Sequence, residues 1–288
     1  MGQDKVDKEQ STVQPTYTHN VRIDHVIFDN DGTLYPEPPD VKQRHMQAAV
    51  RAVHPRYPDK SPADIETLIR QSQKDYKSSF GMFVADILGS EEREAELLRL
   101  RALHYEELSR LAVKDFFDQS AAPTAEIGQL RIAGINVNIA THGNLLWTKF
   151  SVRENGGLSR YFNDTNIFTK DDANCKGKNE GDLFYQKLMD KMNLPQAQKR
   201  GQNCAMVEDT AKNLIEAKRL GMMTILISDT LNSDEKPDHV DLVVPDVKQA
   251  IQAIMQSNLS HGAAPNPNAQ MHQERTPTAN VAAPYDPL

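Results

Sequence analysis

Two aspartates stand where an apolar segment gives way to a turn that contains glycine. Asp29 and Asp31 follow the run HVIF, and Gly32 comes directly after them. In an open α/β sheet, ligands bind beyond the carboxyl ends of the strands, so this position favours a binding site. Two carboxylates this close repel each other unless a cation lies between them or one of them takes a proton.

Each way of relieving this repulsion suggests a catalytic role. Mg²⁺ prefers oxygen ligands and commonly bridges carboxylates to a substrate phosphate, so Asp29 can be a magnesium ligand and a nucleophile together. Asp31, if protonated, can give its proton to a departing alkoxide and later remove one from water. The pair therefore predicts metal-assisted attack on a phosphate ester.

Less specific explanations compete for the same residues. A D-x-D sequence also opens a calcium-binding EF-hand loop, but the sixth position of that loop requires Gly and is Leu34 here. The segment before it also has the pattern of a strand. Two alternatives stay open, namely a turn in which the Asp side chains only cap backbone amides, and a degenerate site without activity.

The same segment resembles the first motif of the haloacid dehalogenase superfamily, an apolar strand followed by DxDGT. Asp29, Asp31, Gly32 and Thr33 match that motif in order. The segment NIATHGN resembles the second motif, a strand that ends in Thr or Ser. The segment AMVEDTAKNLIEAKRLGM resembles the fourth motif, an acidic pair after another strand. The motifs follow the expected order across most of residues 21–256.

The resemblance implies a nucleophile and a set of metal ligands. Asp29 would form an aspartyl-phosphate during turnover. Mg²⁺ would be held by Asp29, by the backbone carbonyl of Asp31 and by Asp209, with Glu208 nearby or acting through water. Because phosphoryl transfer depends mainly on positioning and on neutralising charge, this arrangement is chemically sensible.

The resemblance also implies a phosphate site. The hydroxyl of Thr141, the backbone N–H of His142 and a lysine ammonium would hold the phosphoryl oxygens. The third motif of the superfamily usually reads KPxxxxF, whereas this chain reads CKGKNEGDLFYQ. Lys178 keeps the spacing to Phe184, although Asn179 replaces the proline. The alternatives are a solvated surface role for this lysine, or assignment of the motif to Lys176 or Lys170.

The resemblance favours a phosphatase over a dehalogenase, because dehalogenases do not need an acid at the position of Asp31. Within the superfamily, the run DGTLYP resembles the pyrimidine 5′-nucleotidase branch. The segment DYKSSFGMF supplies Tyr76, Phe80 and Phe83, which could offer an aromatic face to a nucleobase. Aromatic residues on an amphipathic helix can equally be core residues.

We therefore expect a phosphatase for a small phosphate monoester, in particular a pyrimidine nucleoside 5′-monophosphate. The alternatives are a phosphatase or phosphomutase of another small metabolite, such as a sugar phosphate or phosphoglycolate. A third possibility is a non-catalytic binding protein that retains the fold, because a fold alone does not imply a function.

The elements that must position these residues alternate along the chain. Short β-rich runs end at Asp29, Thr141 and Asp209 and recur in NIFT, MTILIS and DLVV, while amphipathic stretches at residues 122–133, 183–192, 211–220 and 247–255 have helical periodicity. This alternation predicts an α/β fold with a Rossmann-like parallel sheet flanked by helices. We place that core at residues 21–40 and 119–256.

The segment between the first and second strands has only helical patterns. In EEREAELLRLRALHYEEL, the leucines at positions 97, 100, 103 and 108 lie close to one helical face. Residues 41–118 are therefore predicted to form a helical cap inserted after the first strand. Polar composition predicts disordered tails at residues 1–20 and 257–288.

Composition limits the possible partners of the 288-residue chain. The net charge of −7 argues against binding to nucleic-acid polymers, which requires a basic surface. No segment has the apolar length of a signal peptide or membrane span, so we expect no membrane partner and a cytoplasmic location. The two cysteines, Cys175 and Cys204, lack metal-ligand spacing and are expected to be reduced.

Overall fold

The computed structural model describes residues 21–261, with gaps at positions 77, 112–116, 118–120, 175, 195–200 and 232. The predicted tail at residues 1–20, most of the predicted tail at residues 257–288, and Cys175 lie outside the described residues. None of the described helices combines the length and the apolar character that crossing a lipid bilayer requires.

The core of the protein is a six-stranded parallel sheet in the order β3-β2-β1-β4-β5-β6. Each predicted β-rich run forms one strand, so the predicted sheet is confirmed. The strands are β1 (His25–Phe28), β2 (Asn136–Thr141), β3 (Ile167–Thr169), β4 (Cys204–Glu208), β5 (Met223–Ile227) and β6 (Leu242–Val244). Phe28, at the end of β1, pairs with Ile139 of β2 and Val207 of β4. The carboxyl ends of the three central strands therefore meet at one edge.

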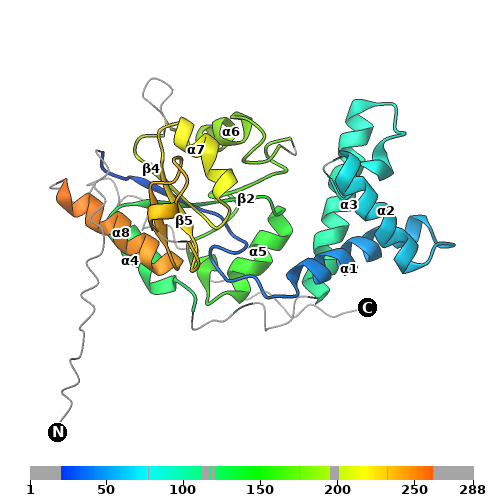
Figure 1. Cartoon of the computed structure of the whole chain (residues 1–288), viewed down its shortest axis with the longest axis horizontal. Coiled ribbons are helices and arrows are strands. Elements are labelled where there is room, and N and C mark those ends of the chain that lie inside the picture. Colours follow the sequence, from blue (N-terminus) through cyan, green and yellow to red (C-terminus); the bar gives the residue numbers. More distant parts are fainter. Residues whose placement is uncertain are drawn as a thin grey trace, which may run out of the picture.

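Helices cover both faces of the sheet (Figure 1). The helices of the first face are α4 (Thr124–Ile132), α5 (Leu145–Glu154) and α8 (Val247–Ser260). The second face is covered by α6 (Leu183–Lys191) and by the helical turn η5 (Ala211–Leu214) with α7 (Ile215–Arg219). Side chains alternate along β1, so that Val26 and Phe28 join the first core cluster while Ile27 joins the second. Burial on both faces explains why the strands read as nearly continuous apolar runs.

The segment between β1 and α4 forms a separate group of helices, which we call the cap (Figure 1). It consists of α1 (Val41–Val53), the turn η1 (His54–Arg56), α2 (Pro62–Tyr76), the turn η2 (Met82–Val84) and α3 (Ser90–Leu111). Its interior includes Val53, Ile65, Ile69 and Leu100. Of the four predicted leucines of α3, Leu100 and Leu108 are fully buried, and those at 97 and 103 are half-buried.

A third apolar cluster joins the cap to the core. Tyr105 and Leu108 of α3 pack there with Tyr35, which follows β1, and with Trp147 of α5. The rings of Tyr105 and Trp147 are stacked with their centroids 6.3 Å apart. The cap therefore rests on the carboxyl edge of the sheet through aromatic contacts.

The predicted start of the C-terminal tail at residue 257 is wrong, because α8 continues to Ser260. Ser257 and Asn258 are buried, and the Asn258 side chain binds both the N–H and the carbonyl of Ile23, each at 2.8 Å. Polar composition placed this boundary too early, because the polar side chain of Asn258 is buried and forms hydrogen bonds with the backbone of Ile23.

Candidate active site

The turn after β1 brings its residues against the end of β4. Gly32 has a φ of +81°, a left-handed conformation that favours glycine. A Cβ atom at this position would collide with the carboxylate of Asp209. The glycine of the DxDGT motif is therefore required both by the backbone and by the close approach of an acidic side chain.

Three carboxylates converge beside this turn. Oxygen atoms of Asp29, Glu208 and Asp209 all lie within 4.8 Å of one another. Burial raises the pKa of Asp29 well above its usual value, and the adjacent Glu208 raises it further. Burial also raises the pKa of Glu208, and burial together with Asp29 raises that of Asp209 to about 6. The group thus concentrates negative charge that a cation would neutralise.

Lys178 supplies one positive charge to this group. Its side chain is fully buried, and its Nζ binds Oδ1 of Asp29 and, at 2.6 Å, Oε2 of Glu208. Burial alone would lower the pKa of Lys178, but the two carboxylates outweigh that effect and raise it. Lys176, by contrast, is exposed. The Nζ atom of Lys170 pairs with Oε1 of Glu180, 3.4 Å away. A solvated surface position for Lys178 is therefore excluded.

His142 anchors the backbone of this lysine. The Nε2 atom of His142 accepts a hydrogen bond from the Lys178 N–H at 2.9 Å. Burial and then the charge of Lys178 lower the pKa of His142 to about 2, so that the imidazole is neutral. The sequence suggested a role for the backbone N–H of His142, whereas the structure also gives its ring a role as an acceptor.

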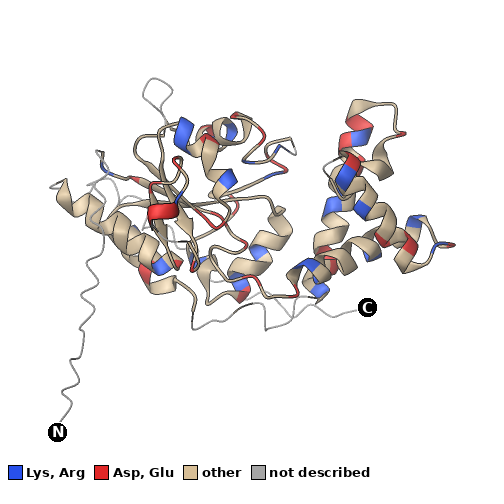
Figure 2. Ribbon diagram, in the orientation of Figure 1, with Lys and Arg blue, Asp and Glu red and all other residues tan. Residues whose placement is uncertain are grey.

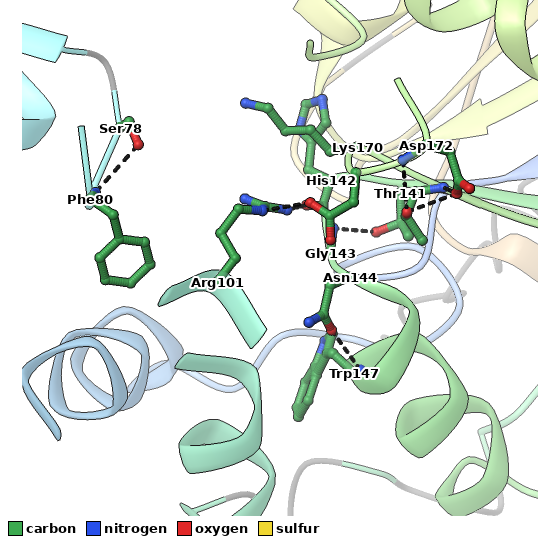
Figure 3. A network of polar contacts seen from close by, with 12 residues as sticks. Ser78, Phe80, Arg101, Thr141, His142, Gly143, Asn144, Trp147, Lys170 and Asp172 are labelled. Carbon is green, nitrogen blue, oxygen red and sulfur yellow. Dashed lines mark hydrogen bonds and ion pairs between the residues drawn. The ribbon is translucent and has the colours of Figure 1, made fainter. Parts of the chain in front are cut away.

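Arg101 connects the cap to the same loop. From α3 its guanidinium donates to Asp171 at 2.6 Å and to the carbonyl oxygen of His142 at 3.1 Å. Figure 3 shows Arg101 reaching toward the loop that carries His142 and Gly143. The position of the cap is thereby linked, through His142, to the segment that holds Lys178.

Thr141 and Asp31 form the second half of the site. The Thr141 hydroxyl accepts from the Gly143 N–H at 2.9 Å and lies 3.3 Å from Oδ2 of Asp31. The other oxygen of Asp31 accepts hydrogen bonds from the Tyr35 hydroxyl and from the Trp147 indole, the latter at 2.6 Å. The Asp31 carboxylate is not a member of the group of three acids. A metal role for this residue would therefore rest on its backbone carbonyl, as the resemblance implies.

Sequence reasoning missed several of these partners. Trp147 lies 116 residues from Asp31, and no local pattern links the two. Asn213 orients Glu208 by donating to its Oε1 at 2.9 Å. This residue lies four positions beyond Asp209, and that spacing at the start of a helical turn is the one signal that could have indicated it.

A cavity of about 1300 Å³ is lined almost entirely by residues of the cap, and none of Asp29, Glu208 and Asp209 lines it. Glu37 and Lys170 line it from outside the cap, α1 contributes His45, α2 contributes Ile69, and α3 contributes Arg101 and His104, among others. The centroids of the two histidine rings are 5.3 Å apart. Burial lowers the pKa of both rings, that of His104 to about 3. The two imidazoles that line the cavity are therefore neutral.

The expected aromatic face is only partly present. Phe80 lines this cavity, and the centroids of its ring and the His104 ring are 5.7 Å apart. Tyr76 is 49 % exposed and lines a different hollow, while Phe83 packs against Tyr57 inside the cap. Of the three residues that could offer an aromatic face to a nucleobase, Phe80 alone lines this cavity. They leave α2 and the following turn in different directions.

The residues present suit a divalent metal ion. The donors of the acidic group are all carboxylate oxygens, which Mg²⁺ prefers. The Lys178 ammonium pairs with two of the three carboxylates, those of Asp29 and Glu208, so the group carries an excess of negative charge without a further cation. Figure 2 shows that acidic and basic residues are otherwise intermixed over the helices of the cap and the core.

Comparisons with known proteins relate the chain to a known family and fold. A family model described as a haloacid dehalogenase-like hydrolase matches residues 23–221. A haloacid dehalogenase-type hydrolase from Entamoeba histolytica is 17 % identical, with 81 % of this chain and all of that chain covered at a TM-score of 0.51. A putative beta-phosphoglucomutase from Bacteroides vulgatus is 14 % identical, with 82 % and 90 % covered at a TM-score of 0.50. At these identities the two structures show the fold alone. No curated protein sequence matches the chain significantly.

Proposed function

The chain belongs to the haloacid dehalogenase-like hydrolases, and within that family we propose that it is a magnesium-dependent phosphatase for small phosphate monoesters. The observation that carries this proposal is the convergence of Asp29, Glu208 and Asp209 with the buried Lys178 at one edge of the sheet. Such a site can bring an anionic phosphate close to an anionic nucleophile. Without compensating positive charge, the two would repel each other.

Asp29 is the proposed nucleophile. Lys178 holds its Oδ1 atom, and no described residue hydrogen-bonds to Oδ2, which leaves that oxygen for attack on phosphorus. The new Oδ2–P bond forms as the ester P–O bond breaks, giving an aspartyl-phosphate and an alkoxide. Water then attacks phosphorus, restores the carboxylate and releases inorganic phosphate.

Asp31 is the proposed acid and base. Tyr35 and Trp147 occupy its Oδ1 atom, so Oδ2, next to the Thr141 hydroxyl, is the oxygen available to carry the proton. It gives this proton to the departing alkoxide and takes one from the attacking water. The fixed hydrogen bonds to Oδ1 support a single orientation of the carboxyl group.

The remaining residues hold the metal ion and the phosphate. Asp29, Asp209 and the backbone carbonyl of Asp31 would bind Mg²⁺, with Glu208 nearby. Bound there, the ion would neutralise charge on the phosphoryl oxygens. Thr141 and the N–H of His142 are proposed to hold those oxygens, with Lys178 beside them.

A pyrimidine nucleoside 5′-monophosphate is the proposed substrate. The DGTLYP resemblance supports this choice, as does a cavity large enough for a nucleoside. Neutral imidazoles and the edge of Phe80 suit an uncharged heterocycle, while Lys170 and Arg101 suit the phosphate side of the ligand. Tyr76 and Phe83 take no part in this proposal.

A substrate panel tests the assignment. Phosphate release from UMP, CMP, AMP, phosphoglycolate and sugar phosphates would be measured with magnesium present, and UMP and CMP should be preferred. Comparable turnover of all compounds would remove the nucleotide assignment but keep the phosphatase. Conversion of a sugar phosphate to its isomer without free phosphate would identify a mutase. Absence of any magnesium-dependent reaction would favour a non-catalytic protein.

Metal binding is tested separately from turnover. Calorimetric titration of the protein with Mg²⁺ should show binding that weakens in Asp209→Ala, because one carboxylate of the group is lost. Asp234→Ala, in the helical turn at Ser233–Glu235, is the matched control and should bind like the wild type. Equal affinities for all three proteins would reject Asp209 as a ligand.

A further inference from the structure

A second cavity lies at the opposite edge of the sheet. It measures about 570 Å³ and opens around the amino ends of the strands, where His25 begins β1 and Asn136 begins β2. His25 and Asp29 are four residues apart, or about 13 Å along a strand. A ligand in this cavity would therefore be separate from the proposed catalytic site.

Two buried polar atoms of residues that line this cavity lack hydrogen-bond partners. The Asn138 side chain is only 7 % exposed, lines the cavity, and its Nδ2 atom has no hydrogen-bond partner. The Nδ1 atom of His25, which also lines the cavity, is likewise unpaired. An unpaired buried donor is destabilising, so its presence calls for an acceptor that the protein itself does not supply.

The charges around the cavity all have one sign. Arg131, Arg160 and Lys191 line it, and none of its described lining residues is acidic, although the chain as a whole carries a net charge of −7. Of these basic residues, Lys191 already pairs with Asp172 at 3.7 Å, and Asp24, next to His25, pairs with Arg22 at 3.1 Å. Among the described residues, Arg131 and Arg160 form no ion pair.

We propose that this cavity binds a small oxyanion, a metabolite that carries phosphate or carboxylate groups. The unpaired amide of Asn138 would donate to an oxygen of the ligand, while Arg131 and Arg160 would neutralise its charge. Its volume lies in the range of small-molecule sites and far exceeds that of one water. Water alone would satisfy the amide but would not explain the absence of acids.

Nuclear magnetic resonance can report on this cavity directly. The side-chain amide signals of Asn138 in the full-length protein would be followed during titration with inorganic phosphate and, separately, with tricarballylate, both without magnesium. We expect a saturable shift of these signals. A response to both probes would indicate a general oxyanion site, and a response to one would identify phosphate or carboxylate as the preferred group.

Variants then test the basic side chains. The pair Arg131→Gln and Arg160→Gln should weaken binding at least about tenfold, or about 1.4 kcal/mol. The pair Arg99→Gln and Arg110→Gln, exposed on α3 and away from this cavity, makes the same charge change and should bind like the wild type. Basal turnover should be unchanged in both. Absence of a shift at Asn138 with either probe, or equal weakening in both pairs, would overturn the proposal.

Discussion

The proposed catalytic edge of the core and the cavity wall of the cap both bury ionisable groups, but these groups differ in charge state. In the core, Asp29 and Glu208 are paired with a charged Lys178. In the cap, burial keeps His45 and His104 neutral beside Phe80. The site in the core therefore contains paired charges, whereas the wall of the cap cavity contains uncharged imidazole and phenyl rings. We expect core substitutions to change turnover and cap substitutions to change substrate binding and acid stability.

The strongest test of this division is Asp29→Asn. Phosphate release should fall to background, because an amide cannot form the proposed aspartyl-phosphate. The fold should stay near normal, since the substitution keeps the shape of the side chain. It replaces a buried carboxyl group whose pKa is raised by burial. Turnover and thermal unfolding would be measured together. Persistent activity would mean that the nucleophile is misassigned.

A smaller loss is expected for Asp31→Asn. Turnover should fall about 10²- to 10⁴-fold, the usual contribution of a general acid and base. Magnesium affinity should stay near the wild-type value, because the proposed ligand at this position is the backbone carbonyl. Asp24→Asn, before the other end of β1, is the control and should turn over normally. An unaltered rate in Asp31→Asn would reject the acid role.

The link between the two regions is tested with Arg101→Met. Removing its hydrogen bonds to Asp171 and His142 should lower kcat/KM about 10- to 100-fold, since charged hydrogen bonds contribute roughly 1.5–3 kcal/mol each. Asp171→Asn should give a smaller loss of the same kind, and Arg101→Lys a partial rescue. If KM and kcat of Arg101→Met match the wild type, the contact does not position the cap during catalysis.

The smallest effect concerns stability and comes from the cap. The pKa of His104 is lowered by burial to about 3, well below its unfolded value near 6.5. The unfolded chain therefore binds the extra proton first, so this contribution is complete above about pH 6.5 and is lost as the pH falls toward 3. At about pH 5 the loss is about 2 kcal/mol. Thermal unfolding of wild type and His104→Gln at several pH values would check this, and parallel pH profiles would contradict it.

The difference between the core site and the cap also explains which residues the sequence could predict. Asp29, Thr141 and Asp209 directly follow or end strands, and chemistry restricts the residue types at such positions, so their convergence was predictable. The backbone of Lys178 depends on a hydrogen bond to His142 across 36 residues. Partners at that separation follow from tertiary packing, so local spacing could nominate Lys178 without separating it from Lys176 or Lys170.

The cap was harder to predict, because its residues must serve both as core and as cavity wall. Helical periodicity correctly indicated helices in this segment, but it did not distinguish Phe80, which reaches the cavity, from Phe83, which packs inside. His45 and His104 were missed because a histidine on an amphipathic helix has no motif around it. Trp147 was missed because its contact with Asp31 joins two distant segments.

The paired hydrogen bonds between Asn258 and Ile23 place the first and last segments of the described fold side by side. A short peptide linker between these two positions would therefore close the chain into a ring without crossing the sheet. New ends could then be opened in an exposed loop of the cap, giving a circular permutant that retains every strand. Shortening the protein before residue 258 would instead remove the side chain that holds the segment leading into β1.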